Sequence, residues 1–199
     1  PECWSKILRG ETSDNNAVVE VAPVPANLLQ TAPHTVNIYK GTSGVDDDMI
    51  IVSPELSNLA AGTQRLTFFA TYLYAQGSLE IGTLNSNNPD AVFTPFDGVS
   101  LTTTSQYYAI DFANYEGTDT FFGIRLNSSG ANTVALIDNL RWEPTPACAT
   151  LLSLDVVDIT DTTAEVFWDT PGNETSWQIA YAPSSVTSPD GLTPVAAPL

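Results

Sequence analysis

The sequence predicts an all-β chain, with one complete jelly-roll β-sandwich followed by an incomplete second β-sandwich. Short runs of β-branched and aromatic residues recur along the chain, and clusters of Gly, Pro, Asn, Asp and Ser separate them. Within the runs, apolar and polar side chains alternate, which is typical of strands that pack on one side. A proline-containing segment, 143–148, then divides the chain, and the strand pattern continues beyond it for a shorter distance.

The composition limits the functions that the chain can have. Its 199 residues are 43% hydrophobic, which is enough for one full core and part of a second. Six Lys and Arg against 23 Asp and Glu give a net charge of −17, which argues against nucleic-acid partners and against direct membrane insertion or binding to anionic membranes. One His and two Cys are too few for zinc clusters, and no apolar run approaches the roughly 18 residues of a membrane-spanning helix.

About eight strands are expected in residues 1–143, and this number is typical of a two-sheet jelly roll. The expected strands are Ala17–Val21, Thr35–Tyr39, Met49–Ser53, Arg65–Tyr74, Ser78–Thr83, Tyr107–Phe112, Thr120–Leu126 and Val134–Trp142. The alternation is clearest in the fourth strand. One of its faces carries Leu66, Phe68, Ala70 and Tyr72, and the other carries Arg65, Thr67, Phe69 and Thr71.

A domain boundary is expected after residue 143, with a stiff linker over 144–150 and a second domain over 151–199. Pro144 and Pro146 disfavour continued strand pairing there. Three further strands are expected, over Leu151–Val157, Thr163–Trp168 and Ser176–Ala182. Three strands leave one hydrophobic face uncovered, so the second domain is expected to be incomplete and the chain to be a fragment of a longer protein.

Two resemblances to known families follow from these segments. The stretch from Leu152 to Tyr181 resembles the first three strands of a fibronectin type III domain, with Trp168 as the core tryptophan of the second strand. Residues 1–143 resemble the MAM-like jelly-roll modules of large secreted proteins of Bacteroidetes, including surface adhesins. This second resemblance rests on the order of five blocks, namely Cys3-Trp4, Met49–Leu59, Gly62–Ala70, Leu79–Thr83 and Ala135–Trp142.

Cys3 and Cys148 form the only candidate disulfide. The ends of the first and last strands of a sandwich often lie close, and an even number of cysteines favours pairing in a secreted protein. The alternative is that both remain free or buried thiols.

Carboxylates mark a candidate metal site. Asp46 and Asp48 belong to a run of three adjacent acids, which a structural Ca²⁺ would relieve of their mutual repulsion. The resemblance to MAM-like modules implies that Asp138, near the last strand, contributes to such a site, although Asn139 follows it where the family has a second acid. The alternative is a solvated acidic turn that keeps a sheet edge soluble.

Tyrosines are the candidate ligand-binding residues. A sugar packs its C–H face on an aromatic ring while neighbouring polar groups bind its hydroxyls. Tyr72, Tyr74 and Tyr108 are expected on exposed faces, together with Tyr107 and Tyr115. The alternative is that these rings belong to the core or to ordinary cross-strand pairs. Asp161-Thr162-Thr163 is similar to the O-glycosylation motif of secreted Bacteroidetes proteins, with Thr162 as the acceptor.

No reaction centre is evident, so we do not expect an enzyme. His34 has no Ser or Cys partner in a recognisable motif, and Ser53-Pro54 lacks the glycines of a nucleophile elbow. The expected function is that of a non-catalytic extracellular module in a long surface or secreted protein, acting in adhesion or as a spacer. Its expected partners are neighbouring sandwich modules, and glycans or cell-surface proteins. The alternative is a carbohydrate-binding module attached to a secreted polysaccharide-degrading enzyme.

Overall fold

A computed structural model of the chain describes residues 3–10, 18–24, 34–41, 48–128, 132–146, 153–169, 177–183, 185, 186, 192 and 194. The chain divides into two compact units, Pro1–Thr145 and Pro146–Leu199. The described residues are all-β apart from the short 3-10 helix η3 (Leu59–Ala61), which confirms the predicted fold class. Within them no helix has the length and apolarity that crossing a membrane requires.

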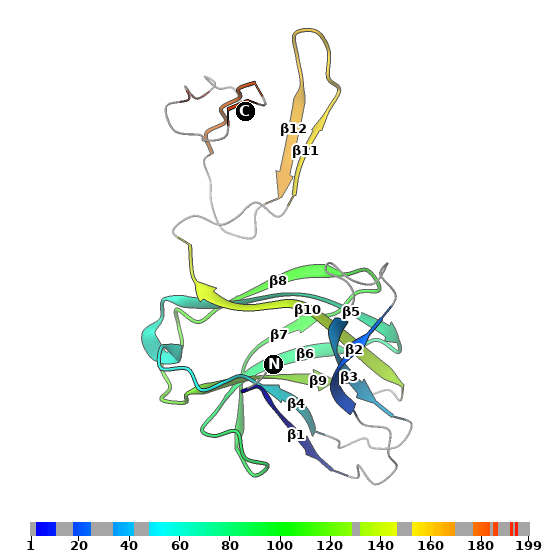
Figure 1. The fold of residues 1–199 in the computed structure, drawn as a ribbon, viewed down its shortest axis with the longest axis vertical. Helices are drawn as coiled ribbons and strands as arrows, with labels where there is room; N and C mark the ends of the chain where they lie inside the picture. The colour runs from blue at the N-terminus through cyan, green and yellow to red at the C-terminus, as the bar shows by residue number, and fades with distance from the viewer. Residues whose placement is uncertain are drawn as a thin grey trace. The chain divides into compact units, whose positions relative to one another are not determined.

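The first unit is a sandwich of two antiparallel sheets (Figure 1). The first sheet has the order β1-β4-β9-β6-β7, with β1 (Ser5–Arg9), β4 (Asp48–Val52), β9 (Phe121–Asn127), β6 (Ser78–Leu84) and β7 (Phe93–Ser100). The second sheet has the order β2-β3-β10-β5-β8, with β2 (Val18–Pro23), β3 (His34–Lys40), β10 (Thr133–Pro144), β5 (Gln64–Tyr74) and β8 (Gln106–Asp111).

All eight strands expected before residue 143 are present, and two more were missed. The missed strands, β1 and β7, are the two edges of the first sheet. β7 contains Pro95, Asp97 and Gly98, which are rare in central strands but tolerated at an edge that pairs on one side only. At the far end of the unit, β10 runs to Pro144, and the Thr145 N–H donates to the Thr63 carbonyl, so strand pairing continues slightly beyond the expected boundary.

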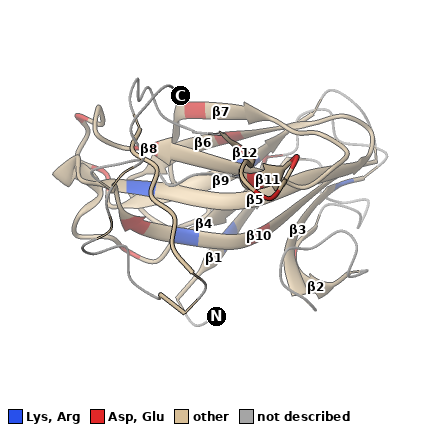
Figure 2. Ribbon diagram, turned by 90° about the horizontal axis from the view of Figure 1, so that it is seen from above, with Lys and Arg blue, Asp and Glu red and all other residues tan. Residues whose placement is uncertain are grey.

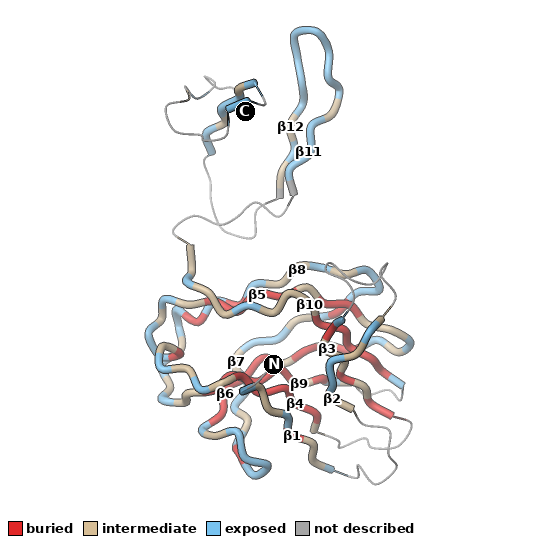
Figure 3. Tube along the Cα trace, in the orientation of Figure 1, coloured by how far each residue is buried: buried red, intermediate tan, exposed pale blue. Residues whose placement is uncertain are grey.

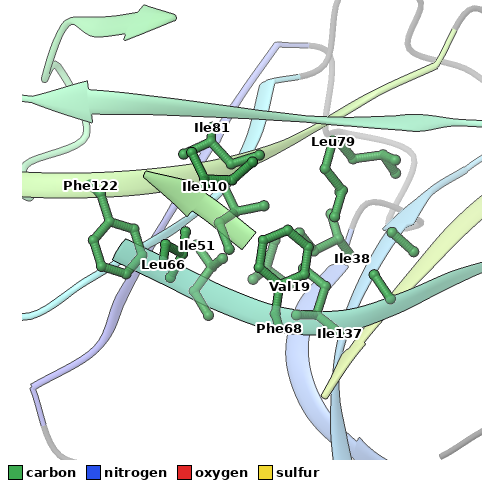
Figure 4. Packing of buried hydrophobic residues seen from close by; sticks show 14 of the residues in the cluster. Val19, Ile38, Ile51, Leu66, Phe68, Leu79, Ile81, Ile110, Phe122 and Ile137 are labelled. Carbon is green, nitrogen blue, oxygen red and sulfur yellow. The ribbon is translucent and has the colours of Figure 1, made fainter. Parts of the chain in front are cut away.

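The alternation in β5 places the core between the two sheets. Leu66, Phe68 and Ala70 are at most 1% exposed, and they pack with apolar side chains from both sheets (Figures 3 and 4). Figure 4 shows Phe68 and Leu66 of β5 among isoleucines and Val19, which other strands contribute. Burial of such side chains is the main favourable term in the folding of this unit.

Six aromatic rings form a continuous cluster within and against this core. Its members come from strands β7, β9 and β10 and from residues that flank β1 and β8, and they are Trp4, Phe96, Phe112, Tyr115, Phe122 and Trp142. Phe112 is central, because its ring contacts those of Phe96 at 4.7 Å, Trp142 at 5.0 Å and Tyr115 at 6.2 Å between centroids. The Trp142 indole N–H donates to Asn58 Oδ1 at 3.0 Å, which satisfies its polar atom.

The outer face of the first sheet carries a smaller apolar cluster, composed of Ile7, Ile50, Val52, Leu84, Ala91 and Phe121, with Phe93 packed against it. The Phe93 ring lies over Gly82 and Gly123, where a β-carbon would approach ring atoms to 2.4 Å and 3.2 Å. The Arg125 guanidinium lies 4.2 Å from the centroid of the same ring. The two glycines therefore provide the space that lets this ring cross the sheet surface.

A chain of ion pairs crosses the same surface, with one residue from each of four neighbouring strands. Asp48 accepts from Arg9 at 3.1 Å and from Arg125 at 3.2 Å, and Arg125 also pairs with Glu80 at 2.7 Å. Basic and acidic side chains alternate across these four strands, so each arginine pairs with a carboxylate.

The second unit contains a two-stranded antiparallel hairpin, β11 (Ser153–Val157) and β12 (Glu165–Asp169). Leu154 is 63% exposed and Phe167 is 52% exposed, although both are strand residues (Figure 3). The Trp168 ring contacts that of Trp177 at 6.0 Å. The third strand expected over Ser176–Ala182 is wrong for its described part, 177–182, which forms no strand. Alternation predicts which face a segment would bury, but a strand also requires a paired neighbour.

Candidate functional site

The outer face of the second sheet is the strongest candidate for a binding surface. It comprises the side chains of that sheet that point away from the first sheet. In β5 these belong to Thr67 and Phe69, because Leu66, Phe68 and Ala70 point into the core. The pairing of β5 with β8 and β10 places Tyr107 and Asp138 on either side of Phe69. The three side chains therefore form a row across three neighbouring strands.

Phe69 and Tyr107 form an aromatic pair on this face. Their ring centroids are 5.4 Å apart, and the ring planes meet at 65°, which is an edge-to-face arrangement. Both residues are half-buried, so part of each ring remains available to solvent. We call these two residues the aromatic pair.

Small and charged side chains follow the aromatic pair along the sheet. The next row contains Ala109, Thr67 and Arg141, and the row after it contains Asp111, Arg65 and Glu143. Both Nε and Nη2 of Arg65 donate to Glu143 Oε1, at 2.9 Å and 2.7 Å. Figure 2 shows the basic positions of β5 and β10 in blue on neighbouring strands. Rings beside small residues and charged groups are suited to a ligand with one apolar and one polar face.

An irregularity in β10 shapes this surface. The pairing with β5 shifts between Asp138 and Arg141, and Asn139 adopts a left-handed backbone with φ of 52°. Such bulges occur where a strand redirects a side chain, and Asn tolerates this conformation better than most residues. Because of the extra residue, Arg141 is opposite Thr67 while Trp142 still points into the core.

The expectation that Tyr72 and Tyr108 lie on exposed faces is wrong. Both are half-buried and pack against the main core cluster, because their strands direct them to the same side as Phe68. Tyr115 belongs to the aromatic cluster, and its hydroxyl accepts the Asp119 N–H at 3.0 Å. Tyr74, at the end of β5, is 80% exposed.

Among the tyrosines expected on exposed faces, Tyr107 lies on the outer face of the second sheet. Phe69 lies there too, but it was not among the expected residues. The alternation of side chains between the two faces of each strand could have identified both residues. In β8, Tyr108 and Ile110 are on the core side, which leaves Tyr107 and Ala109 on the other. The same argument applied to β5 assigns Phe69 to the outer face, opposite Tyr107.

Tyr108 instead joins the two sheets at one edge of the sandwich. Its ring packs on Phe68 at 5.5 Å, and its hydroxyl donates to the Ser100 carbonyl, at the end of β7, at 2.8 Å. Burial raises its pKa above the ordinary value of 10.0, because the phenolate is poorly solvated there, while a hydrogen bond with Thr102 acts in the opposite direction.

Tyr108→Phe should therefore change the alkaline sensitivity of the fold. Below pH 10 both folded and unfolded chains hold the phenol proton, and the variant should lose about 1 kcal/mol with its hydrogen bond to Ser100. Above pH 10 the unfolded chain releases the proton first, so the wild type loses stability that the variant keeps. Urea unfolding at pH 8 and pH 10.5 should show the difference between the two proteins shrinking as pH rises. A constant difference would contradict this assignment.

The structure does not bring the described metal candidates together. Asp48 is in β4 of the first sheet, where both of its carboxylate oxygens face arginines, and Asp138 is in β10 of the second sheet. Asp138 Oδ1 accepts the Asn139 N–H at 2.7 Å. Within the described residues no three His, Cys, Asp or Glu side chains are grouped as metal ligands. Asp46 lies outside the described residues, and the Ca²⁺ site stays a prediction.

The predicted disulfide and the predicted glycosylation site both stay predictions. Cys3 is exposed, and Cys148 lies outside the described residues, so their disulfide also stays a prediction. Thr162 is exposed in the turn between β11 and β12. In this turn the Thr160 and Thr163 hydroxyls are 2.7 Å apart, and Thr160 Oγ1 also accepts the Thr162 and Thr163 N–H groups. Glycosylation at Thr162 remains a prediction.

Comparison with known proteins shows the fold rather than a family. No protein-family model matches the sequence, and no curated protein matches it. The K1 cleaved adhesin domain of Lys-gingipain from Porphyromonas gingivalis W83 is 13% identical, with a TM-score of 0.56, over 73% of this chain and 93% of that domain. The K3 cleaved adhesin domain of the same protein is 14% identical, with a TM-score of 0.52, over 71% of this chain and 90% of that domain.

A carbohydrate-binding domain has a lower similarity. The CBM22-1 xylan-binding domain of Paenibacillus barcinonensis Xyn10C is 12% identical, with a TM-score of 0.48, over 72% of this chain and 88% of that domain. The adhesin domains establish a shared β-sandwich architecture for the first unit. The resemblances to MAM-like modules and to fibronectin type III domains stay predictions.

Proposed function

We propose that the chain is a non-catalytic extracellular module of a long secreted or surface protein, and that its first unit binds a partner in adhesion. The shared architecture with two cleaved adhesin domains supports this proposal at the level of the fold. The strongly acidic composition, with a net charge of −17, is suited to a soluble, self-repelling array of such modules. Neighbouring modules of the same chain are the expected structural partners.

The second unit is proposed to belong to a fibronectin type III sandwich, as its sequence suggests. Leu154 and Phe167 are exposed on the β11–β12 hairpin, and both are the kind of side chain that a sandwich buries. We therefore expect a second sheet to pack on this hairpin and bury these apolar side chains.

We further propose that the first unit binds a glycan on the outer face of its second sheet. The observation that carries this proposal is the aromatic pair. Two half-buried rings with their centroids 5.4 Å apart lie beside Asp138, which is half-buried, and near Arg141, which is exposed. The rings offer an apolar surface to the C–H face of a sugar, and the polar neighbours offer hydrogen-bond partners for its hydroxyls.

Binding of the full chain to a glycan panel tests this proposal, with Phe69→Ala and Tyr107→Ala compared with Tyr74→Ala. Truncating either ring of the aromatic pair should weaken binding about tenfold or more, because each would remove a central contact. Tyr74 is exposed at the strand end, outside this surface, so its truncation should leave the affinity unchanged. Circular dichroism should show that all three variants remain folded.

Two outcomes would contradict the glycan proposal. A panel without any binding would leave the module as a spacer or as a protein-binding adhesin. Binding that is lost in Tyr74→Ala but kept in Tyr107→Ala would place the site at the end of β5 instead.

A further inference from the structure

We infer that the ligand of this outer face carries an isolated carboxylate, as a uronic or sialic acid residue does, and that Arg141 binds it. This inference rests on the proposed glycan-binding function and specifies its ligand class. It begins from the basic residues, because the chain contains only six Lys and Arg against 23 acids.

All six basic side chains lie in the described residues, and five of them have partners in the first unit. Arg9, Arg65 and Arg125 form ion pairs with carboxylates. The amino groups of Lys6 and Lys40 donate to the carbonyls of Val19 and Ser128. Arg141 is exposed and is the one base of this set with neither a hydrogen bond nor an ion pair.

An unpaired arginine in so acidic a chain requires an explanation. Acceptors are abundant, and Glu143 follows Arg141 by two residues in the same strand, yet that carboxylate pairs with Arg65. The guanidinium of Arg141 therefore keeps all its N–H donors for solvent or a ligand. Its planar fork matches a carboxylate, which it can bind through two parallel hydrogen bonds.

The position of Arg141 connects it to the aromatic pair. Arg141 is opposite Thr67, two residues along β5 from Phe69, and Ala109 continues the same row on β8. Diagonal neighbours on one face of a sheet lie within reach of long side chains. Thr67 and Ala109 are the small residues of this row, and Ala109 is exposed while Thr67 is only 3% exposed, so a ring stacked on the aromatic pair would extend its carboxylate over short side chains towards Arg141.

The surrounding charge favours a single carboxylate over a polyanion. Asp111, Asp138 and Glu143 share this face with Arg141 and Arg65. A ligand with closely spaced negative charges would meet these acids as well as the arginine. A glycan in which one acidic sugar is flanked by neutral sugars would place its charge at Arg141 alone.

The test compares acidic glycans with their neutral counterparts by titration calorimetry on the full chain. The pairs are sialyllactose with lactose, and a glucuronic-acid-substituted xylo-oligosaccharide with the unsubstituted one. Wild-type protein should bind at least one acidic member about tenfold more tightly than its neutral counterpart, because charge-assisted hydrogen bonds are stronger than neutral ones. Arg141→Gln should remove this preference, and Arg141→Lys should keep part of it.

Lys6→Gln is the matched control, because it removes the same charge from the first sheet and should leave the preference intact. Equal binding of acidic and neutral members, or a preference that survives Arg141→Gln, would overturn the inference. If neutral glycans bind and depend on Phe69 and Tyr107, the proposed function stands while the inference fails. If no glycan binds, both fail.

Discussion

Phe112→Ala should lower the free energy of unfolding of the first unit by about 3–5 kcal/mol, the largest effect expected from a single substitution. Phe112 is 0% exposed, and its ring contacts three other aromatic rings. Truncation would remove the transfer free energy of the ring and leave a cavity that Trp142 and Phe96 cannot both fill. Urea unfolding followed by circular dichroism measures the loss.

Phe112→Leu keeps most of the buried volume and should cost less than half as much, which provides a measurable variant if the alanine form does not fold. Tyr74→Ala, at an exposed position, should change the free energy of unfolding by less than about 0.5 kcal/mol. A small effect of Phe112→Ala, similar to that of Tyr74→Ala, would show that the aromatic cluster does not stabilise the sandwich.

Gly82→Ala should destabilise the first unit by about 3 kcal/mol through overpacking. A β-carbon at this position would lie 2.4 Å from Phe93 Cζ and 2.6 Å from the Thr94 carbonyl oxygen. The ring can move, but the carbonyl belongs to the paired backbone of β7. The substitution therefore forces strand β7 away from β6, in addition to displacing Phe93. Thermal and urea unfolding both measure the effect.

Gly98→Ala is the matched control in the same strand pair. A β-carbon there would meet only the Leu79 carbonyl oxygen, at 3.5 Å, which is an ordinary contact. This variant should therefore stay within about 0.5 kcal/mol of wild type. Combining Gly82→Ala with Phe93→Leu should recover part of the loss and not all of it, because the contact with the Thr94 carbonyl remains. Full recovery would show that the clash with the Phe93 ring causes the whole loss of stability in Gly82→Ala.

The central strands of the first unit were predictable, because their side chains record which face is buried. Leu66, Phe68 and Ala70 alternate with Thr67 and Phe69, and this pattern alone places a strand in a half-covered sheet. The edge strands of the second sheet, β2 and β8, were also predicted, but those of the first sheet were not. β1 and β7 pair on one side only, so they accept residues such as Pro95 and Gly98 that obscure the pattern.

The candidate site was predictable only in part, because it depends on register. Alternation with Ile110 assigns Tyr108 to the core side and Tyr107 to the outer face, but only the pairing of β8 with β5 shows that Tyr107 lies opposite Phe69. Similarly, nothing in the acidic run predicts that Asp48 meets Arg9 and Arg125, which are 39 and 77 residues away along the chain. Such pairs between distant residues depend on which strands are neighbours in the sheet, and the local sequence does not show this.

Strand order also makes the two ends of the first unit mechanically unequal. β1, near its beginning, is an edge strand that pairs with β4 alone, over Ser5–Arg9. β10, near its end, lies between β3 and β5 and pairs with both. If the first unit were placed under tension, a pull on β1 would separate one short ladder and the Arg9–Asp48 ion pair, whereas a pull on β10 would oppose two ladders at once. The first unit would therefore yield from its N-terminal side, with the sheet that carries the aromatic pair still intact.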